Sequence, residues 1–380
     1  MAENTLTPLI PEIYEALDIV SRELTGMIPS ATLNASANTA AVGQAIRVDI
    51  EPEGNGGDVT PAMVVPDPTG QTSGFTDIII TKSRFMEFGF NGEDQKGLNT
   101  GAGYGTVRAN RIAQAIRKLT NEVEADLCGL QSTFSRAHGT AGTTPFGTAN
   151  DYTDASNALK ILKDNGAPLQ DNQLVINTAA GVNFLGKQSA VNAAGTDSML
   201  RQGVLLDVNG MPIRESAQIN TPAIGGGSSY TSHASGFPVG TTSITLITGS
   251  GTVLAGDVVT FAGDTNKYVV TTGVTAAGAL VIAAPGLVQA LPASAKALSI
   301  VASSARNMAF NRSAIVLAAR APARPVEGDM AVDVTSITDP RSGLTMEFAM
   351  YPGYRKVRYE VALAWGVKNI KPEHTALLLG

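Results

Sequence analysis

The sequence predicts an α+β protein that carries a small all-β module inside a body of helices and strands. Apolar residues at spacings of three and four indicate one long helix over 106–136. Alternating apolar residues indicate strands over Gln44–Ile50 and Phe75–Phe90. The module is indicated by "SITLITGSGTVLAGDVVTFAGDTNKYVVTT" (Ser243–Thr272), where Thr, Val, Ile and Gly alternate between closely spaced turn signals.

Composition narrows the class of protein. The 380 residues are 43% hydrophobic and 16% charged, against about 25% charged in an average domain, so disorder is excluded. A net charge of -6 argues against coating nucleic acid by bulk charge, and a single cysteine excludes a disulfide framework. We expect no signal peptide and no membrane span, because the N-terminus lacks a basic region and no apolar run is long enough. A low charge is compatible with a chain that buries its outer surface against other subunits, and also with some secreted proteins.

The other elements follow from local signals in chain order. Helices are predicted over Pro11–Leu24, Thr153–Gly166 and "NRSAIVLAARAP" (311–322). Strands are predicted in "QLVIN", in a hairpin over Gly203–Ser216, in a hairpin over 330–352 and in "KVRYEVALAWGV" (356–367). The segment "GGGSSYTSHASG" (Gly225–Gly236) is interpreted as a flexible linker that opens the module, which ends near Ala302.

The Gly- and Pro-rich stretch between the first two strands predicts a two-stranded arm with an irregular tip. Such an arm is marginal in water, so we expect it to rest on another subunit. The tip contains acidic residues and no basic one, whereas "YRKVRY" near the C-terminus is basic. We therefore hypothesise an inter-subunit contact, with the alternative that both are solvated surfaces. The residues are Glu51, Glu53, Asp58 and Asp67 on the acidic side and Arg355, Lys356 and Arg358 on the basic side.

Two glycine-containing motifs invite a phosphate-binding interpretation. "GVNFLGKQ" (181–188) has P-loop spacing, but Gln188 replaces the magnesium-binding Ser or Thr, so a helix end is favoured. "GAGYGTVR" (101–108) is interpreted as a hinge into the long helix. Arg108 and Arg111 could be held by a carboxylate or a phosphate, and solvated side chains are the default expectation. The three histidines lack metal-ligand spacing and Cys128 is expected to pack as an apolar residue. We predict no catalytic residue, no cofactor and no metal.

Three stretches carry a resemblance to a known family. They are "RANRIAQAIRKLTNEVE" (108–124), "VLAGDVVTFAG" (253–263) and "ALAWGVKNIKPEHTALLLG" (362–380). In this order they resemble tailed-bacteriophage major capsid proteins with the Hong Kong 97 fold. The chain is most similar to the short-tailed Salmonella phage coat proteins, whose shell domain carries an inserted β-barrel.

The resemblance implies a division of nearly the whole chain. Its parts would be an N-terminal arm (1–43), an extended loop (44–92), a peripheral domain (93–165, with a spine helix at 104–137), an axial domain (166–224), an inserted β-barrel-like domain (225–302), the axial domain continued (303–323) and the peripheral domain continued (324–380). It also implies hexamers and pentamers of this chain in an icosahedral virion shell around double-stranded DNA, assembled in the host cytoplasm. A separate scaffolding protein and a portal protein would be partners, and a decoration protein stays open. The tip holds no lysine for covalent cross-linking, so the shell would be held non-covalently.

Other functions stay open beside the capsid. An encapsulin-like nanocompartment shell would share the fold, although compact encapsulins resemble it without an inserted module. A phage tail or adhesin component would suit the Thr-rich module. A P-loop enzyme would require "GVNFLGKQ" to form a phosphate-binding loop.

Overall fold

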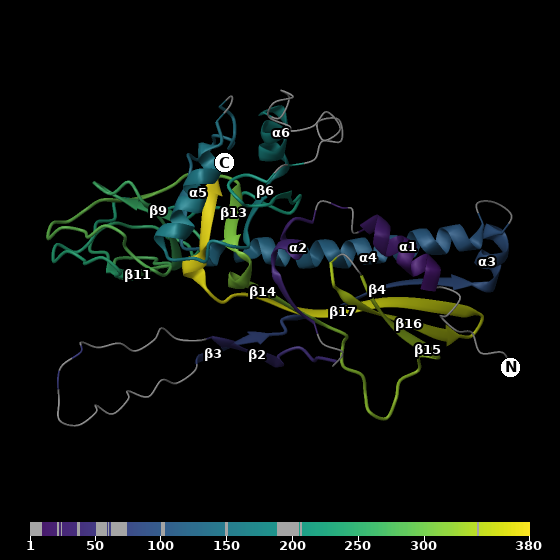
Figure 1. Cartoon of the computed structure of the whole chain (residues 1–380). Helices are drawn as coiled ribbons and strands as arrows, with labels where there is room; N and C mark the ends of the chain where they lie inside the picture. The colour runs from purple at the N-terminus through teal and green to yellow at the C-terminus, as the bar shows by residue number, and fades with distance from the viewer. Residues whose placement is uncertain are drawn as a thin grey trace.

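A computed structural model of the chain describes residues 10–20, 23, 25–35, 39–50, 59, 61, 74–99, 103–148, 151–187, 205, 207–339 and 342–380. It has the predicted mixture of helices and largely antiparallel strands (Figure 1). The long helix α4 (Tyr104–Gly129) lies along a six-stranded sheet and reaches a second, ten-stranded sheet. Within the described residues no helix is both long and apolar enough to cross a membrane.

The six-stranded sheet is built around the long strand β17 (Lys356–Asn369). Its path is β1-β14-β17-β16-β15, and β4 also pairs with β17. The other strands are β1 (Thr32–Ala35), β4 (Lys82–Asn91), β14 (Ile315–Arg320), β15 (Asp333–Thr338) and β16 (Thr345–Gly353). The predicted hairpin over 330–352 and the strand after it are thereby confirmed.

Helix α4 packs its apolar stripe between this sheet and the N-terminal helix α1 (Ile10–Val20). Ile112, Ile116, Leu119, Val123 and Leu127 are all buried, as the 3.6-residue spacing predicts. The helix ends earlier than predicted, however. A 3-10 turn (Leu130–Thr133) follows it, and Phe134 is buried in extended backbone ahead of strand β5. The apolar spacing runs on past the helix end because Phe134 reaches the same core from a different backbone conformation.

The ten-stranded sheet joins the body to the β module. Its path is β12-β9-β10-β5-β18-β13-β6-β7; off this path β11 pairs with β10, and β8 pairs with β11. The body strands are β5 (Arg136–His138), β6 (Asn172–Ile176), β7 (Ile213–Glu215), β13 (Arg306–Asn311) and β18 (Thr375–Leu379). Helices α5 (Thr153–Asp164) and α6 (Thr178–Lys187) share a core with one face of these strands. Strand β6 and the predicted Asn209-Gly210 turn, closed by a Val208–Met211 bridge, are confirmed.

The β module has a core of its own but is not detached. Its strands are β8 (Ser243–Thr245), β9 (Val258–Phe261), β10 (Lys267–Thr272), β11 (Ala279–Ile282) and β12 (Leu298–Ile300). The register Lys267↔Ala137 continues the body sheet into it. The flexible-linker interpretation of Gly225–Gly236 is wrong, because Tyr230 and Ser232 are fully buried. Tyr230 belongs to the module core and its hydroxyl donates to the Gly251 carbonyl at 2.5 Å.

One predicted helix is a strand. Within residues 311–322 the chain makes a short 3-10 turn (Arg312–Ala314) and then β14, between β1 and β17. Every residue of β14 is buried, since both faces of this central strand are covered. A short, continuously apolar run has no alternation to reveal the strand, so local pattern alone cannot separate it from a buried helix.

The predicted strand Phe75–Phe90 divides into two. Residues Gly74–Ile79 form β3, which pairs with β2 (Ala45–Ile50), and β4 begins at Lys82. The remaining short helices are α2 (Met27–Ser30), α3 (Gly92–Leu98) and a 3-10 turn (Pro372–His374). The predicted N-terminal helix is confirmed as far as Val20, and Leu24 lies outside the described residues.

Candidate inter-subunit surfaces

Strands β2 and β3 form a two-stranded sheet of their own, here called the β2–β3 arm. Figure 1 shows it projecting from the six-stranded sheet at the end away from α3. Ile78 and Ile80 anchor its base in a small core with Val316 and Ala364. Lys368 reinforces that base, because its ammonium donates to the Thr76 hydroxyl at 2.7 Å and to the Asp77 carbonyl at 2.9 Å.

The other face of the β2–β3 arm is exposed and partly apolar. Phe75 is 56% exposed and Ile79 is 53% exposed. Arg47 lies 3.7 Å above the Phe75 ring centre and pairs with Asp77 at 3.2 Å. The sheet therefore presents two large apolar side chains around one ion pair, without any described segment of the chain covering them. Glu51, Glu53, Asp58 and Asp67, the acidic half of the hypothesised contact, lie outside the described residues.

The basic half of that contact lies at the turn between β16 and β17. Arg355 has a left-handed backbone (φ 55°) and its guanidinium stacks near the exposed ring of Tyr354. Arg358 is already neutralised, since it pairs with Glu87 at 2.6 Å and with Glu360 at 2.8 Å. Arg355 and Lys356 form no ion pair with the described residues. Of the three predicted cations, these two remain available to a partner.

The turn and the β2–β3 arm lie at opposite ends of the six-stranded sheet. The Arg355 carbonyl accepts from Gly92 at the start of α3, whereas β3 lies beyond the other end of β4 (Figure 1). Strand β4 spans ten residues between them. The described strands of the β2–β3 arm therefore do not contact the basic turn of their own chain.

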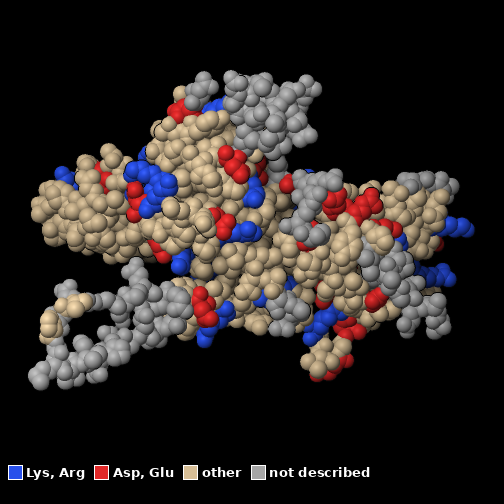
Figure 2. All heavy atoms as spheres, viewed as in Figure 1, with Lys and Arg blue, Asp and Glu red and all other residues tan. Residues whose placement is uncertain are grey.

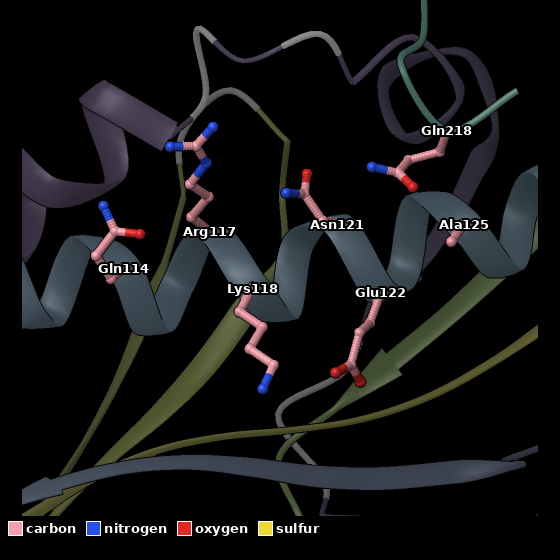
Figure 3. A pocket seen from close by; sticks show the side chains of 7 residues that line it. All are labelled: Gln114, Arg117, Lys118, Asn121, Glu122, Ala125 and Gln218. Atoms are coloured by element: carbon pink, nitrogen blue, oxygen red, sulfur yellow. The ribbon is translucent and has the colours of Figure 1, made fainter.

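The outer face of α4 is lined by polar side chains and forms a shallow groove of about 400 Å³. Figure 3 shows Gln114, Arg117 and Asn121 on the same side of the helix as Gln218, while Lys118 and Glu122 point toward the strands below. Arg117 pairs with Glu23 at 2.9 Å, and Glu122 pairs with Arg84 at 3.2 Å.

Charge over the visible surface is likewise mixed. Figure 2 shows blue and red side chains next to one another and large neutral areas over the β module. Such a surface resembles neither a basic nucleic-acid footprint nor a strongly acidic one.

The start of α4 holds the N-terminal helix α1 through an ion pair. The Arg108 guanidinium binds the Glu12 carboxylate through two hydrogen bonds, at 2.7 and 3.1 Å. The expectation that Arg108 is solvated is therefore wrong, because α1 folds back over the start of α4. Arg111 instead stacks over the Phe90 ring at 4.6 Å.

Glu124 is the residue that sequence reasoning missed. It is fully buried and accepts from the backbone N–H groups of Met27 and Ile28 at 2.8 and 2.9 Å. Burial raises the pKa of Glu124, and the backbone donors partly oppose that rise. The signal was present in the sequence, since an acidic residue directly follows Val123 in the apolar stripe. Such a residue needs a buried partner.

The P-loop interpretation of "GVNFLGKQ" is wrong, because Gly181 to Lys187 lie inside helix α6. The Lys187 ammonium donates to the Asp151 carbonyl and lies 5.5 and 5.3 Å from the ring centres of Phe146 and Tyr152. A phosphate could not approach it without displacing these contacts.

Metal ligation and thiol chemistry find no support in the described residues. Within the described part of the chain, no three His, Cys, Asp or Glu side chains gather as a metal site. Cys128 is buried, and burial raises its pKa to about 12, so it is an unreactive thiol.

No protein-family model and no curated protein matches this chain. Solved structures with a similar fold include a capsid of the cyanophage P-SCSP1u, at 9% identity and TM-score 0.48, covering 92% of this chain and 86% of that one. The mature capsid of bacteriophage PhiM1 is similar at 10% identity and TM-score 0.46, covering 92% and 85%. A virus-like particle from Pyrococcus furiosus is similar at 11% identity and TM-score 0.41, covering 97% and 99%. Because these TM-scores lie below 0.5, the function proposed next rests on the chain's own residues.

Proposed function

We propose that this chain is the major capsid protein of a tailed bacteriophage. Copies of it would form the hexamers and pentamers of an icosahedral shell around double-stranded DNA. The observation that carries the proposal is the β2–β3 arm, a two-stranded sheet that leaves the body with Phe75 and Ile79 exposed. An isolated two-stranded sheet is marginal in water, and a neighbouring copy would supply the missing contacts.

The order of the elements supports the same proposal. An N-terminal segment, an extended two-stranded loop, a long helix, an inserted β module and a long C-terminal strand follow one another along the chain. This order matches the division that the family resemblance implies, including the β insertion of the short-tailed Salmonella phage coat proteins. We assign 44–92 to the extended loop and 225–302 to the inserted domain on this basis.

The proposed partners follow from the same resemblance. They are other copies of the chain, a separate scaffolding protein and a portal protein, with the packaged DNA held without sequence-specific contacts. The mixed surface charge favours the last point. The inserted β module favours a virion shell over an encapsulin-like compartment.

Assembly of designed variants tests the proposal. The chain is expressed alone and together with its candidate scaffold, and shells are sought by electron microscopy and light scattering. We expect closed shells from the unaltered chain. The double variant Phe75→Asp, Ile79→Asp should remain folded by circular dichroism and lose assembly.

A matched control separates the β2–β3 arm from a general effect of added charge. Val239→Asp lies on the β module, where Val239 is 62% exposed, and should leave assembly intact. Fibres from the unaltered chain would favour a tail component instead. A chain that stays monomeric at every concentration and salt, even with the scaffold, would refute the shell.

A further inference from the structure

A polar cavity of about 310 Å³ lies apart from these surfaces, where the loop from β5 to α5 folds against the end of β18. His138 of β5, Asp154 of α5 and Lys267 of β10 line it together with Leu379. Figure 1 shows this corner beside α5 and the C-terminal end of the chain. Three titratable side chains thus converge from the body and the β module, which is unusual on a chain with so few charges.

The Lys267 and His138 side chains have hydrogen-bond donors to spare. The Lys267 ammonium donates to the Gly139 carbonyl, which leaves two of its three N–H groups for another partner. His138 Nε2 lies 3.0 Å from the side-chain nitrogen of Asn157, which can only donate. In the neutral imidazole Nε2 accepts from Asn157 and the proton lies on Nδ1, whereas a charged His138 requires the Asn157 amide to turn so that its oxygen accepts from Nε2–H.

Threonine hydroxyls supply further donors along the loop. Four of them line the cavity, and none hydrogen-bonds to another described residue: Thr140, Thr143, Thr144 and Thr148. The only carboxylate there, among the described residues, is Asp154, which accepts from the Phe146 N–H at 2.7 Å. Phe146 is buried in a left-handed backbone (φ 61°), so the loop is held in a shape that costs energy.

We propose that this cavity binds an oxyanion, a carboxylate or phosphate group, held by Lys267, His138 and the threonine hydroxyls. Lys267, His138 and the four threonine hydroxyls provide several donors, and the first turn of α5 adds the positive end of a helix dipole. Asp154, which also lines the cavity, disfavours a ligand of high negative charge.

The electrostatics of the cavity agree with this assignment. Burial, and then the nearby Lys267, lower the pKa of His138, while Asp154 raises it. Burial also lowers the pKa of Lys267. An anion between the two cations would favour both charged forms and so reverse the shift at His138.

The oxyanion has two possible sources. One is free inorganic phosphate, which would bind the single chain. The other is an acidic side chain of a second copy, and only this source rests on the proposed shell function.

The chain has three histidines, so few NMR signals compete with that of His138 in a test of oxyanion binding. Full-length, unassembled chain labelled with ¹⁵N-histidine is titrated with inorganic phosphate, and the pH titration of His138 is followed by NMR. We expect saturable phosphate binding to raise the pKa of His138 by about half a unit or more. His233, which does not line the cavity, is the internal control.

Variants decide whether Lys267 carries the effect. Lys267→Met should abolish it and Lys267→Arg should retain it, with folding checked by circular dichroism. Lys160→Met, an exposed lysine on α5 paired with Asp164, is the matched control and should change nothing. A response that persists in Lys267→Met, or that His233 shares, overturns the proposal.

A second measurement separates the two sources. Shells assembled in phosphate-free buffer are examined by magic-angle-spinning NMR. A His138 pKa that rises on assembly, without responding to phosphate in the free chain, identifies a carboxylate of a second copy. If phosphate has no effect and assembly either leaves His138 unchanged or does not occur, the cavity binds no oxyanion. A phosphate response in a chain that forms no shells would support oxyanion binding in the cavity. It would count only against the proposed shell function.

Discussion

The β2–β3 arm and the β module both project from the body of the protein, and they are stabilised differently. The arm is six paired residues long, pairs only with itself and leaves Phe75 and Ile79 exposed. The module buries thirteen side chains in its own core and extends the body sheet through β10 and β5. The β module, with a core of its own, can keep its structure in a single chain. The arm, whose small core lies on one face only, leaves its other face to whatever it contacts outside.

The largest expected difference is in the folding of two fragments of the β module that begin at different residues. A fragment spanning 225–302 keeps Tyr230 in the core and should give a dispersed NMR spectrum. A fragment spanning 235–302 lacks Tyr230 and the bridge of Thr231 to Ala297, and should be unfolded. The reason is that a module of this size has only a few kcal/mol of stability to lose. Equal dispersion from both fragments would mean that the glycine-rich segment is a linker after all.

Replacing phenylalanine with alanine should lower the free energy of unfolding much more in the β module than in the β2–β3 arm. Phe261→Ala removes a ring that is 1% exposed and should lower the free energy of unfolding by about 3–5 kcal/mol. Phe75→Ala removes a half-exposed ring of the arm and should change it by about 0.5 kcal/mol or less, while weakening assembly. Urea unfolding of the unassembled chain measures both. Similar costs would show that the arm is already packed within one chain.

The N-terminal segment is an intermediate case, because one buried carboxylate holds it. Glu124→Ala leaves the N–H groups of Met27 and Ile28 unpaired, which should cost about 1–3 kcal/mol for each group that stays buried. Glu122→Ala on the same helix is the control, since its exposed pair with Arg84 is worth about 1 kcal/mol or less. Equal losses would contradict a special role for Glu124.

The same residue predicts a pH dependence. Burial raises the pKa of Glu124 above its ordinary 4.5, so the folded chain binds this proton more tightly than the unfolded chain. Its contribution to stability is then fully present below the unfolded pKa and is lost as pH rises through the folded pKa. In Glu124→Gln this component should vanish. Urea titrations of both chains between pH 4 and 7 would detect it, and parallel curves would contradict it.

The smallest effect concerns the hypothesised contact between arm tip and basic turn. Glu51→Lys with Glu53→Lys should slow assembly, and adding Arg355→Glu with Lys356→Glu should partly restore it. Exposed pairs contribute about 0–1 kcal/mol each, and salt should reduce the difference. Changing Arg358 as well should give no further recovery, because Glu87 and Glu360 already neutralise it. No recovery at low salt would place the tip elsewhere.

The elements that sequence predicts correctly are those whose pattern is local. The stripe of α4, the alternation of β17 and the β15–β16 hairpin each repeat a period that one chain segment carries by itself. The two-stranded arm was also predicted, from alternation on both sides of a Gly- and Pro-rich stretch. The acidic tip, Glu51 to Asp67, stays a hypothesis about contact with another copy.

The sequence by itself determined the periodic elements and the low charge. Only the tertiary structure decided that β14 is a strand, because β1 and β17 supply hydrogen bonds from far along the chain. It also decided that Tyr230 lies in the core of the β module and that Glu124 accepts hydrogen bonds from α2. His138 and Lys267 line the same cavity for the same reason. In each case the deciding partner is distant in sequence, and hydrogen bonding and burial depend on that partner rather than on the neighbouring residues.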